Sequence, residues 1–281
     1  MPAEPVTSLA MDGPVLVFGG PYSNLQATEA VLAEAARRGI PPRRIICTGD
    51  VVAYGADAAR CCDLVMGSGI AVIAGNCEEN LAAGALDCGC GFEEGTACDL
   101  LSRAWYAHAD REVTPAHRAW MAGLPRRIVL ALPDGRRLAV LHGGTQDISR
   151  FLFASAPEAD LAAEIAATGC EGVIAGHCGL PFARRVGDGL WLNAGAIGMP
   201  ADDGTPRAWF AVLSPGDGAL RVEVLPLGYD HAAAAAAMRA ARLPEGYAAA
   251  LGSGLWPSCD VLPATELARR GVALDPVVLE W

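Results

Sequence analysis

The chain has 281 residues, of which 52% are hydrophobic and 19% are charged, and its formal net charge is −11. This composition excludes a disordered chain, because the apolar side chains suffice for a large core. The negative charge, with no basic run longer than an arginine pair, argues against a nucleic-acid binder. No apolar stretch is long enough to span a membrane, and the N-terminus lacks the features of a secretion signal. We therefore expect a cytoplasmic protein without membrane contact.

The first part of the chain predicts three repeats of a strand followed by a helix or loop. A strand over 15–18 leads to a helix that Asn24 is placed to cap. A second strand ends at Gly49 and leads to a helix over 56–66, and a third strand ends at Gly75. Repeats of this length predict a parallel or mixed sheet with helices packed on it.

The second part predicts helices first and then a more antiparallel sheet. A cysteine-rich segment, GALDCGCGFEEGTACD, precedes helices over 100–110 and 116–121. Three hairpins with the turns PDG, GDG and SPGDG follow, and an alanine-rich stretch then predicts two short helices. No linker or repeat divides the chain. We predict one domain over 1–228, with C-terminal helices and a weakly periodic tail over 229–281 packed on it.

Polar residues beside a small residue follow four of the predicted strands. These residues are Asp50, Asn76, His142 and His177. One such residue alone is more often hydrogen-bonded for structure, but four at successive strand ends favour a shared site. Carboxylate, amide and imidazole groups together suit a divalent metal, and we expect at least one Zn, Mn or Fe ion per chain.

Five motifs in this order carry a resemblance to a known family: GDVVAYG, GNCEEN, LHGG, GHCGLPF and LNAGAIGMP. They resemble the calcineurin-like metallophosphoesterases, and most closely their bacterial branch of small phosphodiesterase-like proteins. The resemblance extends roughly over residues 14–255. It implies an α/β fold, a four-layer α/β/β/α sandwich with a short C-terminal helical extension, whose loops hold two metal ions.

The resemblance also implies which residues bind the two metals. Asp50 would bridge them, and one metal keeps its further ligands, which are Asn76, His142 and His177. The other metal lacks the aspartate and two histidines that it would hold alone, and their places are taken by Gly20, Tyr22 and Gly179. Two-metal hydrolysis depends on a clamp across the attacking and leaving oxygens, so its ordinary form is in doubt here.

The altered cleft predicts a ligand-binding surface where the missing metal would lie. The residues expected to line it are Gly20, Tyr22, Asn24, Cys178 and Gly179. We expect the Tyr22 ring to fill the vacated space.

The cysteines offer a second set of candidate groups. Cys77 replaces the family histidine that protonates the leaving oxygen, so Cys77 or the adjacent Glu78 would handle protons. Cys77, Cys88 and Cys90 are candidate thiolate ligands for zinc or iron. Without a secretion signal, metal binding, redox chemistry or burial explains ten cysteines better than disulfides do.

These observations predict a divergent metal-dependent phosphoesterase, a hydrolase of phosphodiesters or phosphomonoesters that uses metal-activated water. One alternative is a catalytically inactive relative that binds a phosphorylated ligand or a partner protein. Another is a metal or redox module built on the cysteine-rich segment. We expect a small phosphorylated ligand as the partner, and the sequence leaves the substrate and the oligomeric state open.

Overall fold

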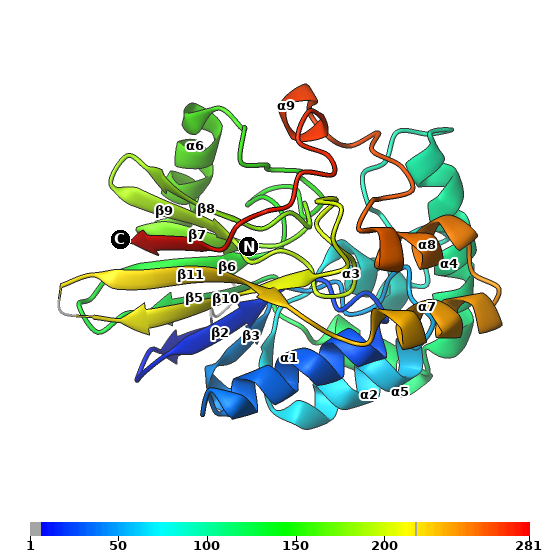
Figure 1. The fold of residues 1–281 in the computed structure, drawn as a ribbon. Coiled ribbons are helices and arrows are strands. Elements are labelled where there is room, and N and C mark those ends of the chain that lie inside the picture. Colours follow the sequence, from blue (N-terminus) through cyan, green and yellow to red (C-terminus); the bar gives the residue numbers. More distant parts are fainter. Residues whose placement is uncertain (1–6, 217) are drawn as a thin grey trace.

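The computed structural model describes residues 7–216 and 218–281, and within these ranges two six-stranded sheets stack face to face (Figure 1). The first sheet has the order β1 (Thr7–Ala10), β5 (Arg127–Ala131), β6 (Arg137–Leu141), β7 (Gly172–Ala175), β9 (Gly189–Asn193) and β8 (Phe182–Val186). The second has the order β12 (Val277–Glu280), β11 (Leu220–Leu227), β10 (Ala208–Pro215), β2 (Val15–Phe18), β3 (Ile45–Cys47) and β4 (Ala71–Val72). Residues 1–6, part of the stretch expected to carry no secretion signal, lie outside the described residues.

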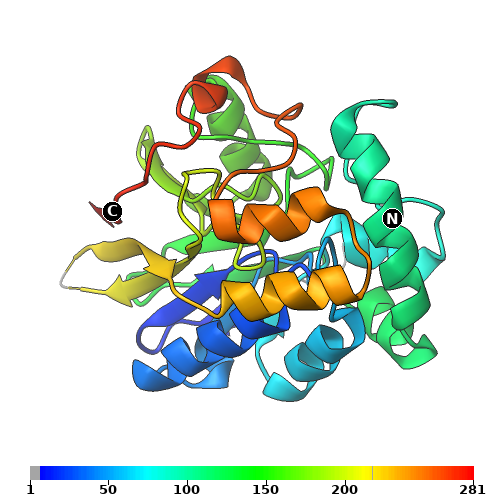
Figure 2. The ribbon, with the colours of Figure 1, turned by 45° about the vertical axis from the view of Figure 1, so that its right-hand side comes forward.

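Helices cover the outer faces of both sheets and extend beyond one end. The helices are α1 (Leu25–Arg37), α2 (Ala58–Ser68), α3 (Asn76–Ala83), α4 (Ala97–Glu112), α5 (Pro115–Ala122), α6 (Glu158–Thr168), α7 (His231–Ala240), α8 (Glu245–Ser253) and α9 (Ala264–Leu267). Helix α6 lies outside the first sheet, and α1 and α2 lie outside the second (Figure 1). Helices α7 and α8 lie side by side (Figure 2). The predicted four-layer sandwich with C-terminal helices is confirmed.

The apolar run of β2 explains how the layers hold together. Successive side chains of a strand point to opposite faces. Val15 and Val17 accordingly pack between the two sheets, whereas Leu16 and Phe18 pack against the helices of the second sheet. A strand buried on both faces needs apolar residues at every position, as this strand has.

Each sheet combines strands from the first and the second part of the chain, which the sequence did not predict. The hairpins of the second half form as expected, but β6, β7 and β9 pair in parallel within the first sheet. Strand β10, which follows β9 in the chain, belongs to the second sheet and pairs there with β2. Turn residues determine only the pairing inside a hairpin, so the assignment of hairpins to sheets depends on long-range packing.

The tail returns to the second sheet. Its last strand, β12, pairs with β11. Residues of α7 also lie in the hydrophobic cluster that contains Leu16 and Phe18. The domain boundary at residue 228 stays a prediction. Among the helices of the described ranges, none combines the length and apolar character needed to cross a membrane.

Candidate metal centre and the cavity beside it

The loop after β3 places Asp50 at the end of the second sheet. Gly49 and Asp50 both adopt left-handed conformations, with φ of +94° and +54°. A Cβ atom on Gly49 would lie 2.6 Å from the Gly75 backbone nitrogen, so the close approach of these loops requires glycine. Left-handed non-glycine residues are concentrated at functional sites, and aspartate tolerates this conformation better than most residues.

Asn76 begins α3 and points its amide oxygen toward the first sheet. Its Nδ2 donates a hydrogen bond to the Cys88 carbonyl at 2.9 Å. This bond determines the orientation of the amide, and Oδ1 accordingly lies 3.1 Å from His142 Nε2. The loop that carries Cys88 therefore orients a candidate metal ligand.

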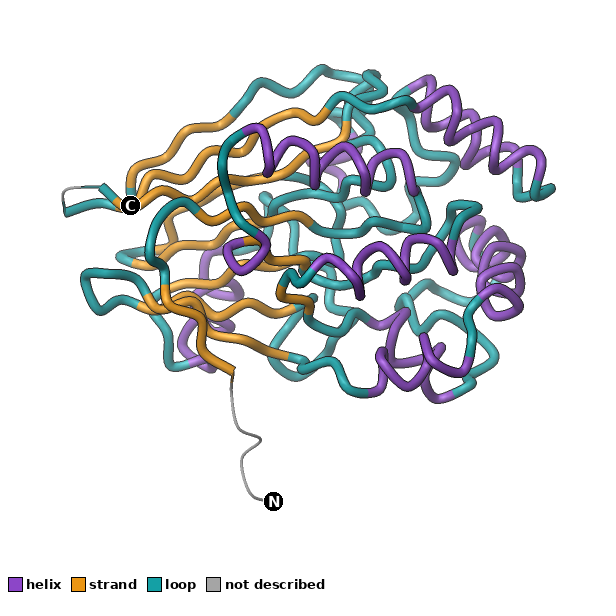
Figure 3. The backbone as a smooth tube through the Cα atoms, turned by 90° about the horizontal axis from the view of Figure 1, so that it is seen from below, coloured by secondary structure: helices purple, strands orange, loops and turns teal. Residues whose placement is uncertain are grey.

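His142 and His177 follow β6 and β7 of the first sheet, so the site joins strand ends of both sheets. In Figure 3 many of the connecting loops run through the middle of the molecule, between strands and helices. His142 Nδ1 lies 2.7 Å from the Thr48 carbonyl and can only donate there. Its Nε2 then carries the lone pair of the neutral ring, and lies 3.2 Å from Asp50 Oδ2 and 3.1 Å from His177 Nδ1.

The four side chains predicted to meet do lie together, and their atoms suit a cation. Ligand atoms of Asp50, His142 and His177 all lie within 4.8 Å of one another. All four residues are buried. Lone pairs that converge in a buried place repel each other unless a proton or a cation lies among them. One carboxylate oxygen, one amide oxygen and two imidazole nitrogens fit a divalent ion such as Zn, Mn or Fe.

Asp50 and the two histidines shift one another's pKa values. Burial by itself would raise the pKa of Asp50, but His142 and His177 lower it below the usual value. Burial would lower the pKa of His142, but the neighbouring Asp50 carboxylate raises it. Burial, together with the closeness of His142, lowers the pKa of His177 to about 3. A neutral His177 has a free lone pair, which a metal ligand requires.

Glu78 is not placed to transfer protons, contrary to expectation. Its carboxylate accepts hydrogen bonds from the backbone nitrogens of Asp50 at 2.7 Å, Val51 at 2.9 Å and Gly75 at 2.9 Å. Both oxygens are therefore occupied by backbone groups. Helix α3 begins at Asn76, and its first turn directs Glu78 back into the loop that carries Asp50. The residue supports the site and does not line it.

Cys77 also lacks the features of a proton donor. Burial, and then the charges of Asp50 and Glu78, raise the pKa of its thiol well above the usual value. The side chain lies in the hydrophobic cluster beneath α3 and does not line the cavity described below. The side chains whose ligand atoms converge are Asp50, His142 and His177, and Cys77 is not among them.

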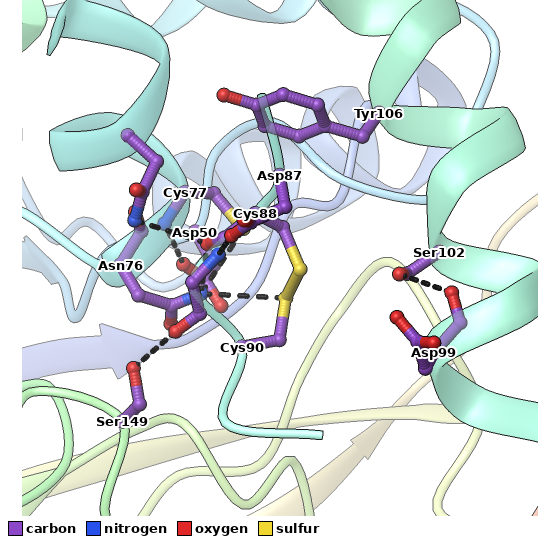
Figure 4. Close-up of a disulfide and its surroundings, with 12 residues drawn as sticks. Asp50, Asn76, Cys77, Asp87, Cys88, Cys90, Asp99, Ser102, Tyr106 and Ser149 are labelled. Carbon is purple, nitrogen blue, oxygen red and sulfur yellow. Dashed lines mark hydrogen bonds between the residues drawn. A yellow bond between two sulfur atoms is a disulfide. The ribbon is translucent and has the colours of Figure 1, made fainter. Parts of the chain in front are cut away.

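Cys88 and Cys90 are joined by a disulfide, as Figure 4 shows beside Asp50 and Asn76. Gly89 between them adopts a left-handed conformation, with φ of +61°, and the two Cα atoms lie 5.3 Å apart. This separation lies within the usual range for a disulfide. We expected metal binding, redox chemistry or burial to explain the cysteines better than disulfides, and this pair corrects that expectation. In the oxidised form neither sulfur is a thiolate, so neither is a metal ligand.

The places of the three missing ligands are filled by aromatic side chains. A Cβ atom on Gly20 would collide with the Tyr22 ring, and one on Gly179 would lie 3.7 Å from both the Tyr22 hydroxyl and the Trp256 ring. The Tyr22 ring therefore lies between the two glycines, where a side chain at either position would project. Trp256 comes from the C-terminal tail, which no motif marked as part of the site.

Two further residues expected at the cleft have different surroundings. Asn24 caps α1, as the sequence predicted, by accepting a bond from the Ala27 nitrogen at 3.1 Å. Its Nδ2 donates to the Gly198 carbonyl, so the side chain is occupied and does not line the cavity. Cys178 does line it, although burial raises the pKa of its thiol to about 12.

A cavity opens beside Asp50 and His177, and its wall is mainly aromatic. The aromatic side chains that line it are Tyr22, Tyr54, Phe92, Phe151, Tyr247 and Trp256. Of these rings, only Tyr22 was expected here. Tyr54 belongs to the motif GDVVAYG but was given no role, and the others lie in loops, in helix α8 and in the tail. These residues are far apart in the sequence, so no local pattern marked them as one group.

The fold agrees with comparisons to known proteins. Residues 22–217 match the model of the calcineurin-like phosphoesterase superfamily domain. The chain belongs to this superfamily. The resemblance seen in the motifs is therefore confirmed at the level of the superfamily.

Three similar proteins show how far the likeness extends. A metallophosphoesterase from Sphaerobacter thermophilus is 25% identical, with a TM-score of 0.67 over 86% of this chain and 99% of that one. An uncharacterised protein of Methanocaldococcus jannaschii is 25% identical over 249 residues, which is 82% of this chain and 94% of the relative. A hypothetical protein from Pyrococcus horikoshii is 18% identical, with a TM-score of 0.70 over 86% of this chain and 99% of that one, and shows the shared fold alone.

Proposed function

We propose that this protein is a metal-dependent phosphoesterase that holds one divalent cation on Asp50, Asn76, His142 and His177. The observation that carries the proposal is the convergence of these four buried side chains from both sheets. Bound there, the cation would supply Lewis acidity toward a phosphoryl oxygen and lower the pKa of a bound water molecule.

The surrounding residues hold this ligand set in place. The Thr48 carbonyl orients His142, and the Cys88 carbonyl orients Asn76. Glu78 supports the loop that carries Asp50. Partners that orient the ligands in this way raise metal affinity and fix the tautomer of the histidines.

The cavity offers little acid catalysis to the leaving group. Asp50 and His177 are its only carboxylate and imidazole groups among the described lining residues. Both belong to the proposed ligand set. Burial raises the pKa of the three lining tyrosines, Tyr22, Tyr54 and Tyr247, which makes them weak acids. An ester whose leaving oxygen needs no proton is therefore the best substrate, because it leaves as a stable anion.

A second candidate function is the binding of a phosphorylated ligand without turnover. One observation favours it, namely that Tyr22 and Trp256 fill the place of the other metal. Two-metal members of the superfamily use both ions to clamp the reacting oxygens. A chain with one ion keeps an anion-binding site but loses that clamp.

One experiment separates the two functions. Elemental analysis of the purified protein counts metal ions per chain, and an aryl phosphodiester with added manganese tests turnover. The variant is Asp50→Asn, because asparagine also tolerates the left-handed backbone at this position. The matched control is Asp188→Asn, which alters an exposed carboxylate in the turn between β8 and β9.

A phosphoesterase should contain one metal ion per chain, and Asp50→Asn should lose the metal and lower turnover more than about a hundredfold. The Asp188→Asn control should retain both properties. One metal ion without turnover supports the binding function. A wild-type protein that takes up no metal, even with zinc or manganese in excess, contradicts both functions.

A further inference from the structure

The aromatic cavity is continuous with the candidate metal centre. Asp50 and His177 line the same hollow as the aromatic side chains, and the Phe151 ring centroid lies 4.3 Å from that of His177. A phosphoryl group held at the centre therefore has its ester group beside these rings.

The lining carries almost no charge outside the metal centre. Among the described residues that form it there is no lysine or arginine, and Asp50 is its only carboxylate. A further phosphate or carboxylate on the ester group would find no cation to compensate for its lost hydration. The cavity therefore favours an uncharged ester group.

The rings are packed against each other before any ligand arrives. Tyr54 contacts Tyr22 edge-on at a centroid distance of 4.8 Å and Tyr247 at 4.9 Å. Aromatic pairs prefer these edge-on and tilted arrangements. A wall already ordered in this way loses little side-chain entropy when an aromatic ligand binds.

Trp256 also forms part of the wall, and three hydrogen bonds fix its position. Its Nε1 donates to the Pro200 carbonyl at 2.7 Å, and its backbone nitrogen donates to Asp202 Oδ1 at 2.6 Å. Arg270 Nη2 donates to its carbonyl at 2.8 Å. The tail is thus anchored to the loop after β9, and its indole ring is held against the cavity.

We propose that this cavity binds an uncharged aromatic group of a phosphoester, and that Trp256 is the residue that selects it. The inference rests on the proposed function for the position of the phosphoryl group. It also agrees with a lining whose described residues include no carboxyl or imidazole group besides Asp50 and His177, since a phenolate leaves without a proton more readily than an alkoxide.

The test compares two non-hydrolysable anions, phenylphosphonate and methylphosphonate, by calorimetric titration of the metal-loaded protein. The two probes share the phosphonate and differ in the aromatic ring. We expect phenylphosphonate to bind about tenfold more tightly. In Trp256→Ala this ratio should fall toward one, while the affinity for methylphosphonate stays within about twofold of the wild type.

Two further variants make the result specific. Trp256→Phe keeps a ring and should recover most of the preference. Trp120→Ala removes a tryptophan from α5, which does not line the cavity, and should leave the ratio unchanged. A melting curve for each variant shows that the fold is retained.

The outcomes distinguish this inference from the proposed function. Equal affinity for the two probes in a protein that binds metal and turns over substrate overturns the inference alone. A preference for phenylphosphonate that Trp256→Ala removes, in a protein without turnover, supports the inference and leaves the enzyme function contradicted. A preference that Trp256→Ala leaves intact overturns the selecting role of Trp256.

Discussion

Glu78 shows how a buried charge can serve the backbone of a site. Its side chain is fully buried, and backbone nitrogens from two loops surround it. The loop that carries Asp50 adopts left-handed conformations that few residues favour. Hydrogen bonds donated to a charged acceptor are about twice as strong as neutral ones, so this carboxylate offsets the strain of the loop.

Replacing Glu78 by glutamine should destabilise the protein. The amide would turn an N–H group toward backbone N–H donors and leave at least one of them without an acceptor. We expect the free energy of unfolding to fall by about 3 kcal/mol, measured by urea denaturation.

The control for this prediction is Glu29→Gln, which alters an exposed carboxylate on α1. It should change the free energy of unfolding by less than about 0.5 kcal/mol. An unchanged urea midpoint for Glu78→Gln would contradict the supporting role that we assign to this residue.

The loop between α3 and α4 connects the disulfide to the metal centre. Cys88 accepts from Asn76, and Ser149 donates to the Gly89 carbonyl from the loop after β6. The disulfide constrains the short segment that offers both carbonyls. The oxidised loop therefore holds the Asn76 amide in the orientation that faces His142.

Removal of this disulfide should weaken metal binding without abolishing it. In the double variant Cys88→Ser and Cys90→Ser the carbonyl of residue 88 remains but is less well positioned. We expect the metal dissociation constant to rise about tenfold, the lower end of the effect of losing a ligand's partner. Competition with a chromophoric chelator measures it.

Cys259→Ser is the matched control, because Cys259 is a free, partly exposed cysteine of the tail. Its metal affinity should equal that of the wild type. Equal affinity in the double variant as well would show that the disulfide does not position Asn76.

Helix α1 contains a carboxylate, Glu34, whose contribution to stability depends on pH. Glu34 binds Arg37 at 2.7 Å and Arg38 at 2.6 Å, and these partners lower the pKa of Glu34 from 4.5 to about 2. The stabilisation is complete above the unfolded pKa and is lost as the pH falls through the folded value.

We expect Glu34→Gln to lower the free energy of unfolding by about 1 kcal/mol at pH 7, since the pair is partly exposed to solvent. The difference from the wild type should shrink as the pH falls from 4.5 toward 2. Urea denaturation at several pH values measures it. A difference that grows with acidification would refute the assignment of the effect to this ion pair.

The two sheets are tied together at the last residue of the chain. Trp281 follows β12 in the second sheet, yet its Nε1 donates to the Asp188 carbonyl of the first at 2.8 Å. The Arg136 guanidinium, also from the first sheet, lies 4.1 Å from its ring centroid. The indole ring is buried in the cluster between the sheets.

Trp281→Ala should destabilise the whole sandwich, because it leaves a cavity between the sheets and removes both contacts. We expect a loss of about 3 kcal/mol in the free energy of unfolding. Val278→Ala, on the exposed side of the same strand, should cost much less. Thermal and urea denaturation of the two variants compare them, and equal losses would argue against a tie through the indole.

The strand–loop units of the first part, the hairpins of the second, the superfamily and the position of the candidate metal ligands were predictable from sequence. Each depends on local patterns: apolar runs that end at glycine, capping residues such as Asn24, turn triplets, and polar residues placed directly after strands. Parallel strands end at the same edge of a sheet, so Asp50 lies near Asn76 in the second sheet and His142 lies near His177 in the first. The meeting of the two pairs depends on how the sheets stack.

The remaining features depend on contacts between segments far apart in the chain. The direction of Glu78, the aromatic filling by Tyr22 and Trp256, and the route of the tail back to β11 have no local pattern that specifies them. They follow from which loops and strands pack side by side, since burial and hydrogen bonding select a side-chain direction only once the neighbours are in place.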